Sequence, residues 1–348
     1  MLAVVVLAAA AAVLVVLLAP DRLGLADRTP VAQLVALRGL LALLLVGAGV
    51  LLVGVVGGWR QIATRAGLRR PGWRLPLALA ALLALGGAAQ AAVVAGRGVD
   101  GSGPGPAADG ELVVLSFNTF GVVPTGDLVA LVEQQDADLV VLAETSGATA
   151  REVARALTDA GRPTTALAAD SESTRVDGVA LLVRDPLGSY TQTTAGLPAT
   201  ELGTFAAVRA GAAETAAADA RTGVPAPEVV VAAHTRAPSA ESSMPDWRAH
   251  AEGVAEVCRS TPGAIVAGDL NATLDHPGLT DLGPCVDAAA ATGSAGLGTW
   301  PADVPRLLAA PIDHVLVDGR AWRVTGFGVL PAVGSSDHRP VVAHLARR

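Results

Sequence analysis

The sequence predicts a helical membrane anchor followed by an α/β domain, and three observations support this prediction. The 348 residues are 51% hydrophobic and only 16% charged, with a mean hydropathy of +0.49, whereas soluble proteins carry about 25% charged residues. The apolar excess is concentrated in three uncharged segments near the N-terminus. Farther along the chain, short Val-rich runs alternate with segments of helical periodicity, which is typical of an α/β domain.

The three uncharged segments cover about residues 1–20, 39–58 and 75–94. A helix of that length spans about 30 Å, the thickness of the hydrocarbon layer. A buried core helix is the alternative for any one segment, but three of them within 94 residues favour membrane spans. The first segment lacks a basic n-region and a clear small-residue cleavage site, which favours a retained span over a cleaved signal peptide. We therefore assign residues 1–95 to a membrane anchor with three transmembrane helices.

The arginines predict the orientation of this anchor. The loop between the second and third spans carries five arginines and no acid, whereas the preceding loop has three arginines and two aspartates. The positive-inside rule places the five-arginine loop in the cytoplasm, so the chain after the third span is predicted on the extracytoplasmic side of the cell membrane. The lipid bilayer is then one predicted partner. The five arginines are Arg60, Arg65, Arg69, Arg70 and Arg74; the three are Arg22, Arg28 and Arg38.

Charge and composition separate the anchor from the rest of the chain. A Gly/Pro-rich stretch over 96–110 has the composition of a flexible linker, and residues 111–348 are predicted to form the second domain. Residues 1–96 contain 8 Arg and 2 Asp, a net charge of +6, whereas residues 97–348 contain 17 Arg and 30 acids, a net charge of −13. Such an acidic domain lacks the basic surface of a non-specific nucleic-acid binder, which lowers the expectation of a nuclease without removing it.

Six short apolar runs are predicted to be buried strands of this domain, at 112–117, 139–143, 179–183, 229–233, 264–267 and 314–317. Residues 127–135 and 245–259 are predicted helices. In the second of these, Trp247, Val254 and Val257 recur near helical spacing, with acids between them. Most strands run directly into polar residues, and loops at strand ends are where such folds carry their chemistry.

The two cysteines, Cys258 and Cys285, exclude a disulfide-dense scaffold and a Cys-rich zinc module. Outside the cytoplasm such a pair usually oxidises, which predicts one disulfide that closes the loop following Asn271. The chain-entropy model gives this loop closure about 3–4 kcal/mol of stabilisation. A catalytic thiol is the alternative, and no other feature of the sequence supports it.

Clusters of polar residues lie at the ends of the apolar runs. Taken singly, each has a simple structural explanation as a turn, a helix cap or a hydrogen-bonded core histidine. Taken together, they supply the groups that metal-assisted phosphoester hydrolysis needs. The clusters are Ser-Phe-Asn-Thr at 116–119, Ala-Glu-Thr at 143–145, His-Thr-Arg-Ala-Pro at 234–238, Gly-Asp-Leu-Asn at 268–271, Pro-Ile-Asp-His at 311–314 and Ser-Asp-His-Arg-Pro at 336–340.

Three of these residues, Glu144, Asp337 and Asn118, offer the hard oxygen ligands that suit Mg²⁺ or Mn²⁺. Asp269 is a carboxylate that can activate water, and the amides of Asn118 and Asn271 can donate to a phosphoryl oxygen. The remaining groups are two imidazoles for charge stabilisation or leaving-group protonation, His234 and His338, and a carboxylate to orient one of them, Asp313.

The order and flanks of these clusters resemble the endonuclease/exonuclease/phosphatase superfamily over about residues 110–348. The Gly-Asp-Leu-Asn stretch and the terminal Ser-Asp-His-Arg-Pro-Val carry most of the resemblance. The resemblance implies a four-layered α/β sandwich with two facing mixed sheets. It also implies divalent-metal-dependent hydrolysis by in-line attack of an activated water on phosphorus. The three-span anchor is similar to that of bacterial membrane-bound members of the superfamily.

The resemblance also implies a role for each residue. These roles are metal binding for Glu144, Asn118 and Asp337, water activation for Asp269, phosphate binding for Asn271, charge stabilisation for His338 held by Asp313, and a second acid at His234.

Two positions depart from the family pattern. Ala143 stands where many members have Gln, and Phe120 stands where abasic-site endonucleases have Asp, which argues against that branch. Two further residues are candidates for substrate contact. Trp300 lies in a Thr-Trp-Pro stretch similar to a family loop near the substrate, and it serves either to stack on substrate or simply to pack. Arg236 is the candidate for contact with a substrate phosphate.

The leading hypothesis is thus a membrane-anchored hydrolase whose phosphoester substrate is either a nucleic acid or a phospholipid or phosphorylated metabolite. The family favours a nuclease, whereas the tether and the acidic domain favour the second class. A non-catalytic surface binding module is the alternative from another class. A transporter or channel is disfavoured because the predicted spans carry no charge. Nothing in the sequence implies an obligate protein partner.

Overall fold

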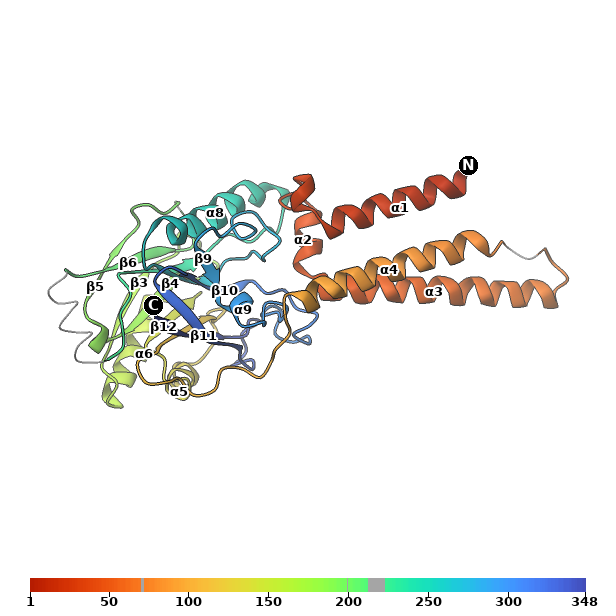
Figure 1. The fold of residues 1–348 in the computed structure, drawn as a ribbon. Helices are drawn as coiled ribbons and strands as arrows, with labels where there is room; N and C mark the ends of the chain where they lie inside the picture. Colours follow the sequence, from red (N-terminus) through yellow and green to blue (C-terminus); the bar gives the residue numbers. More distant parts are fainter. Residues whose placement is uncertain (70–71, 199, 212–222) are drawn as a thin grey trace. The chain divides into compact units, whose positions relative to one another are not determined.

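The computed structural model describes residues 1–69, 72–198, 200–211 and 223–348 (Figure 1). Arg70, one of the five loop arginines, lies outside the described residues. The chain divides into two compact units, Met1–Gly96 and Arg97–Arg348. The first unit is helical, and the second contains two β-sheets.

The first unit contains two helices that are long and apolar enough to cross a membrane, α3 (Arg38–Arg65, 28 residues) and α4 (Arg74–Gly96, 23 residues). The prediction of three such spans is therefore corrected to two among the described residues. The predicted first span forms α1 (Leu2–Leu18), whose 17 residues reach about 26 Å at 1.5 Å per residue. The turn η1 (Asp21–Leu23) and the short helix α2 (Val31–Ala36) connect α1 to α3.

Small residues let α3 and α4 approach each other closely. A Cβ atom added to Gly49 would lie 2.9 Å from the carbonyl oxygen of Ala80, and one added to Gly87 would lie 2.8 Å from that of Ala42. Contacts of this kind between small residues are typical of helices packed within a membrane.

A buried polar group ties α1 to the other two helices. The guanidinium of Arg38 and the side-chain amide of Gln90 each donate to the carbonyl oxygen of Leu17 at 3.0 Å, and Arg38 also donates to the Gln90 side-chain oxygen. The three helices are therefore joined by hydrogen bonds as well as by apolar packing.

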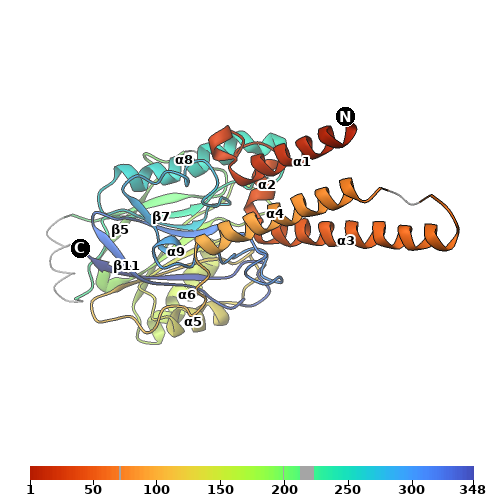
Figure 2. The ribbon, with the colours of Figure 1, turned by 45° about the vertical axis from the view of Figure 1, so that its right-hand side comes forward.

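The second unit is a four-layered sandwich, as predicted (Figures 1 and 2). The helices α5 (Thr125–Gln134) and α6 (Gly147–Asp159) cover the first sheet, and α8 (Met244–Ser260) covers the second. In spatial order, the first sheet contains β11 (Trp322–Val329), β12 (Val341–Arg347), β1 (Leu112–Asn118), β2 (Leu139–Ala143), β4 (Val179–Arg184) and β3 (Thr164–Ala169). The second contains β5 (Tyr190–Thr193), β6 (Phe205–Arg209), β7 (Val229–His234), β8 (Ile265–Asp269), β10 (Asp313–Asp318) and β9 (Cys285–Asp287).

The two sheets share one topology, although the sequence shows no internal repeat. Each has a central parallel pair, β1–β2 in the first and β7–β8 in the second. Antiparallel strands flank both pairs, so that β12, β4 and β3 of the first sheet correspond to β6, β10 and β9 of the second. The C-terminal ends of the two central pairs are therefore equivalent positions.

Burial on both faces explains why the central strands read as continuous apolar runs. Every residue of β1, β2 and β8 is buried, because one face of each sheet packs on the other sheet and the opposite face packs on helices. All six predicted strands and both predicted helices are present. The strands β3, β5, β6, β9, β11 and β12 were not predicted. Of these, β3 and β5 are half-buried edge strands rich in Thr and Ala.

The segment that the composition predicts to be a flexible linker makes specific contacts with the second unit. Arg97 forms an ion pair with the buried carboxylate of Asp275 at 2.7 Å. The amide of Asp100 donates to the carbonyl of Gly293 at 3.0 Å, and the Ser294 hydroxyl donates to the carbonyl of Asp100 at 2.9 Å. A disulfide joins Cys258, near the end of α8, to Cys285 at the start of β9.

Candidate active site

The candidate site lies where the central strands of both sheets end. Asn118 is the last residue of β1, and Glu144 follows β2 directly. His234 ends β7 and is paired in register with Asp269, the last residue of β8. Asp313 opens the antiparallel strand β10 opposite Asp269. The topology alone thus brings residues that are up to 195 positions apart in the sequence to one seam between the sheets.

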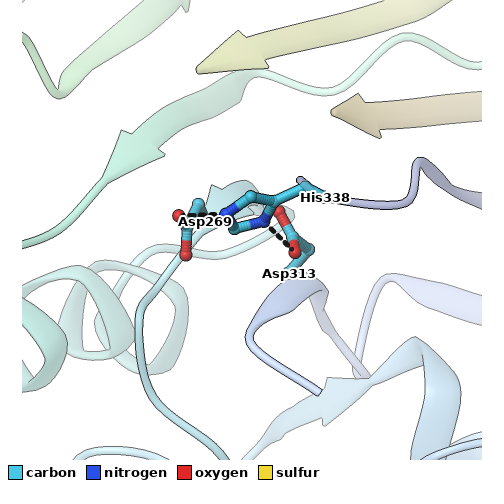
Figure 3. A group of neighbouring side chains, drawn as sticks. All are labelled: Asp269, Asp313 and His338. Atoms are coloured by element: carbon cyan, nitrogen blue, oxygen red, sulfur yellow. Dashed lines mark hydrogen bonds and ion pairs between the residues drawn. The ribbon is translucent and has the colours of Figure 1, made fainter. Parts of the chain in front are cut away.

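His338, Asp313 and Asp269 form the buried centre of this seam (Figure 3). The Nδ1 atom of His338 lies 2.8 Å from Oδ2 of Asp313, and its Nε2 atom lies 3.7 Å from Oδ2 of Asp269. Burial by itself would lower the pKa of His338, but the carboxylates of Asp313 and Asp269 outweigh it and raise the pKa to about 10. His338 is therefore an imidazolium at neutral pH, with Nε2–H directed toward the seam.

The Asn118 side-chain amide bridges two carboxylates. Its Nδ2 atom donates to Oε1 of Glu144 at 2.9 Å and to Oδ2 of Asp269 at 3.0 Å, while its Oδ1 atom accepts from the backbone amide of Phe120 at 2.9 Å. Glu144 and Phe120 have positive φ angles of 49° and 53°. Such backbone strain in non-glycine residues is concentrated at functional sites, where the surrounding structure maintains it.

Burial shifts the protonation of the other acids and of His234. It is the largest cause of the raised pKa of Glu144, to which the nearby carboxylates of Asp337 and Asp177 add. Burial likewise raises the pKa of Asp269, opposed by the charge of His338. Burial lowers the pKa of His234, whose Nε2 atom lies 3.7 Å from Asp269 and 3.8 Å from Glu144. His234 is thus a neutral imidazole at pH 7 and needs a proton before it can act as an acid.

Asn271 is held in a strained turn immediately after Asp269. Its φ angle is 45°, its backbone amide donates to Oδ1 of Asp269 at 2.8 Å, and its side-chain amide donates to the carbonyl of Thr235 at 2.9 Å. The indole of Trp247 donates to the Asn271 carbonyl at 2.9 Å. These bonds fix the Asn271 side chain beside the Asp269 carboxylate.

His314 stabilises the same turn through two hydrogen bonds. Its Nδ1 atom lies 2.7 Å from Oδ2 of Asp287, and its Nε2 atom lies 2.9 Å from the carbonyl oxygen of Ala272. Since both partners are acceptors, both ring nitrogens carry hydrogen. The pKa of His314 is accordingly raised, because the bond and charge of Asp287 outweigh burial.

The donor set of the site fits a hard divalent cation. Oδ1 of Asp337 is a buried carboxylate oxygen without a hydrogen-bond partner among the described residues, and the Glu144 carboxylate lies close enough for Asp337 to raise its pKa. Carboxylate and amide oxygens are what Mg²⁺ and Mn²⁺ prefer. Ligand atoms of Asp269, Asp313 and His338 also lie within 4.8 Å of one another. Because the Asp313 carboxylate is already bonded to His338, we regard that trio as acid–base machinery.

The structure thus gathers Asn118, Glu144, His234, Asp269, Asn271, Asp313, Asp337 and His338 at one seam. The two residues predicted to contact substrate lie in different environments. The Trp300 indole reaches the seam by donating to Oδ2 of Asp337 at 2.8 Å. The guanidinium of Arg236 is instead engaged in an ion pair with Glu201.

Three residues that shape the site have no role predicted from the sequence. The Ser336 hydroxyl donates to the carbonyl of Asn118 at 2.7 Å and accepts from the amide of His338 at 3.0 Å, which joins two of the clusters. His314 lies next to Asp313 in the Pro-Ile-Asp-His cluster, but its charge depends on partners that the sequence does not indicate. Asp177, whose charge raises the pKa of Glu144, lies in an isolated Asp-Gly pair that matches no recognisable motif.

A four-layered sandwich with acids, amides and a His–Asp pair at the ends of its central strands defines the structural class of this chain. The family description "Endonuclease/Exonuclease/phosphatase family" matches residues 115–338, and the chain belongs to that family. The family includes nucleases and phosphatases.

Solved structures show the same fold at low sequence identity. An endonuclease/exonuclease/phosphatase from Beutenbergia cavernae DSM 12333 is 18% identical with a TM-score of 0.52, covering 68% of this chain and 72% of that one. D. rerio TDP2 complexed with single-strand DNA product is 15% identical with a TM-score of 0.50, covering 68% and 99%. A comparison with curated proteins finds no significant match.

Proposed function

We propose that this chain is a membrane-anchored, divalent-metal-dependent phosphoester hydrolase whose second unit faces the extracytoplasmic side. The observation that carries the proposal is the buried His338–Asp313 pair directed at Asp269, with Asn118 joining Asp269 to Glu144. It combines a fixed positive charge, a carboxylate base and an amide donor within one seam. Membership of a family of nucleases and phosphatases supports the same reaction class.

Each of these groups has a definite task in hydrolysis. Asp269, whose pKa burial raises, accepts a proton from the attacking water. The water oxygen bonds to phosphorus as the P–O bond to the leaving group breaks, and the leaving oxygen takes a proton from solvent. Nε2–H of the His338 imidazolium donates to a phosphoryl oxygen and stabilises the negative charge that develops there. Asp313 maintains the charge and the orientation of that ring. The Asn271 side-chain amide donates to the carbonyl of Thr235 and, over a longer 3.3 Å, to Oδ2 of Asp269; a second phosphoryl oxygen takes over the donor of this longer bond.

Glu144, Asp337 and Asn118 are the residues proposed to hold Mg²⁺ or Mn²⁺. When bound, such an ion supplies Lewis-acid polarisation of the phosphoryl oxygen and neutralises developing charge. The buried, unpartnered Oδ1 of Asp337 and the amide–carboxylate bond between Asn118 and Glu144 support this donor set.

The test is hydrolysis by the full chain in detergent with Mg²⁺, Mn²⁺ or EDTA. The substrates are plasmid DNA, RNA, sphingomyelin, phosphoinositides and bis-p-nitrophenyl phosphate. We expect EDTA-sensitive turnover that Glu144→Gln and His338→Ala abolish. Glu133→Gln, an exposed glutamate on α5, is the matched control and retains activity. Nucleic-acid cleavage would assign a nuclease, and turnover of only lipids or small phosphoesters would assign the other substrate class. No turnover by folded protein would favour a binding module.

The membrane part of the proposal has independent support. Only 11% of the apolar window of α3 and 22% of that of α4 is buried against the rest of the protein, unlike core helices of soluble proteins. We expect the chain to resist extraction from membranes at alkaline pH. We also expect protease added outside intact spheroplasts to degrade residues 97–348. Protection of that unit would reverse the proposed orientation.

A further inference from the structure

Trp300, whose side chain is exposed, makes a contact in the site that has no assigned role. Its Nε1–H donates to Oδ2 of Asp337 at 2.8 Å. The other oxygen of that carboxylate, Oδ1, is buried without a partner among the described residues and lies 4.0 Å from Nε2 of His338. The two oxygens of this carboxylate thus differ, since Oδ2 contacts the indole and Oδ1 faces the seam.

The backbone around Trp300 is firmly held, so the indole is a fixed donor. Its amide donates to the carbonyl of Ala310 at 3.1 Å, and its carbonyl accepts from the amide of Ala310 at 2.6 Å. The neighbouring Thr299 hydroxyl accepts from the amides of Ile312 and Asp313 at 3.2 and 3.3 Å. The same loop is thus bonded to the strand that begins with Asp313.

The buried Arg339 connects this loop to the segment that contains Asp337 through hydrogen bonds. The guanidinium of Arg339 donates to the carbonyls of Pro301 at 3.3 Å and Ala302 at 2.6 Å, and its backbone amide donates to the carbonyl of Thr299 at 2.9 Å. In return, the amide of Ala302 donates to the carbonyl of Asp337 at 2.7 Å. The indole and the carboxylate therefore lie on segments that one network of hydrogen bonds holds together.

We infer that Trp300 is a positioning residue for Asp337. Its N–H holds one carboxylate oxygen so that the other is presented to a divalent cation. This inference rests on the proposed function, because it takes Asp337 as a ligand of that cation. Partners that orient metal ligands contribute about 10–100-fold to metal affinity. A stacking surface for substrate, by contrast, needs the face of the ring and makes no use of N–H.

Trp300→Phe separates these two roles, because it keeps an aromatic face and removes the donor. The test is the dissociation constant of Mn²⁺, measured by the electron paramagnetic resonance signal of free Mn²⁺ over the full chain in detergent without substrate. We expect at least about tenfold weaker binding in Trp300→Phe. Leu307→Ala, an exposed side chain in the same loop, is the matched control and keeps the wild-type affinity.

A double-mutant cycle with Asp337→Asn shows whether Trp300 acts through that carboxylate. If it does, Trp300→Phe weakens Mn²⁺ binding little further once Asp337 is replaced. Wild-type affinity in Trp300→Phe, or additive losses in the double variant, would overturn the inference. Absence of Mn²⁺ binding by the wild type, or full binding by Glu144→Gln, would instead contradict the proposed metal site.

Discussion

The chemical state of each residue in this site depends on the groups that surround its polar atoms. His338 is charged because the carboxylates of Asp313 and Asp269 outweigh its burial, whereas burial keeps His234 neutral although two carboxylates also lie near its Nε2 atom. The two imidazoles therefore enter any reaction in opposite protonation states. Asn118 separates two carboxylates that would otherwise repel each other, because its amide can donate to both.

The charge of His338 predicts a pH dependence of stability. Its pKa is about 10 in the folded protein, against about 6.5 in an unfolded chain. A raised imidazole pKa stabilises the folded state fully below pH 6.5, and this stabilisation is lost as the pH rises from 6.5 to 10. The difference in melting temperature between wild type and His338→Gln, measured in EDTA, should shrink across that interval. A difference that is constant with pH would contradict the prediction.

At the scale of elements, the turn after β8 depends on strands β9 and β10. His314 on β10 bonds to Asp287 at the end of β9 and to the carbonyl of Ala272, so the charged pair links three segments. The same Asp287 carboxylate accepts from the amide of Ala290 and caps α9 (Ala288–Ala291). The position of Asn271 is thus set partly by residues that touch no substrate.

Breaking the His314–Asp287 pair should be costly. Removing one partner leaves the other charge buried, which typically costs about 3–5 kcal/mol. We expect Asp287→Asn and His314→Phe each to lower the urea midpoint, and the double variant to lose clearly less than the sum of the two. Additive losses would show that the pair is not coupled.

The disulfide anchors β9 to the end of α8. Replacing Cys258 and Cys285 by serine should lower the free energy of unfolding by about 3–4 kcal/mol on the chain-entropy model, since the bond closes a loop of 27 residues. The site itself contains neither cysteine, so we expect hydrolysis at low temperature to persist in the double variant. Equal stability of the oxidised and reduced proteins would contradict this prediction.

At the scale of the whole molecule, the acids of the seam converge only when both sheets have packed together. A cation that binds the folded chain alone therefore stabilises it by mass action, by about 2.7 kcal/mol at 100 times its dissociation constant. We expect Mg²⁺ to raise the melting temperature of the second unit, EDTA to reverse the rise, and Glu144→Gln to abolish it. The same rise in Glu144→Gln would place the ion elsewhere.

The sequence predicted what depends on local pattern and order. The apolar runs of β1 and β8 and the residues that end them were recognisable because both strands are buried on both faces. The edge strands β3 and β5, whose Thr and Ala residues carry little periodic signal, were not, and neither were β6, β9, β11 and β12. The first span was overestimated because an uncharged stretch does not reveal where its helix ends.

Side-chain contacts between distant segments could not be predicted from the sequence. Nothing near Trp300 indicates that its indole bonds to Asp337, and nothing near His314 indicates that it bonds to Asp287 and to a carbonyl from another loop. The linker composition likewise gives no sign of the ion pair between Arg97 and Asp275, 178 positions away. These contacts depend on the relative placement of segments, which local propensity does not encode.

The two sheets share one topology, and the residues of the site come from both of these equivalent halves. Asn118 and Glu144 end the central pair of one half, and His234 and Asp269 end that of the other. Neither half contains a complete set of groups. A fragment carrying one half alone therefore lacks part of the set, even though its sheet has the same topology as the other.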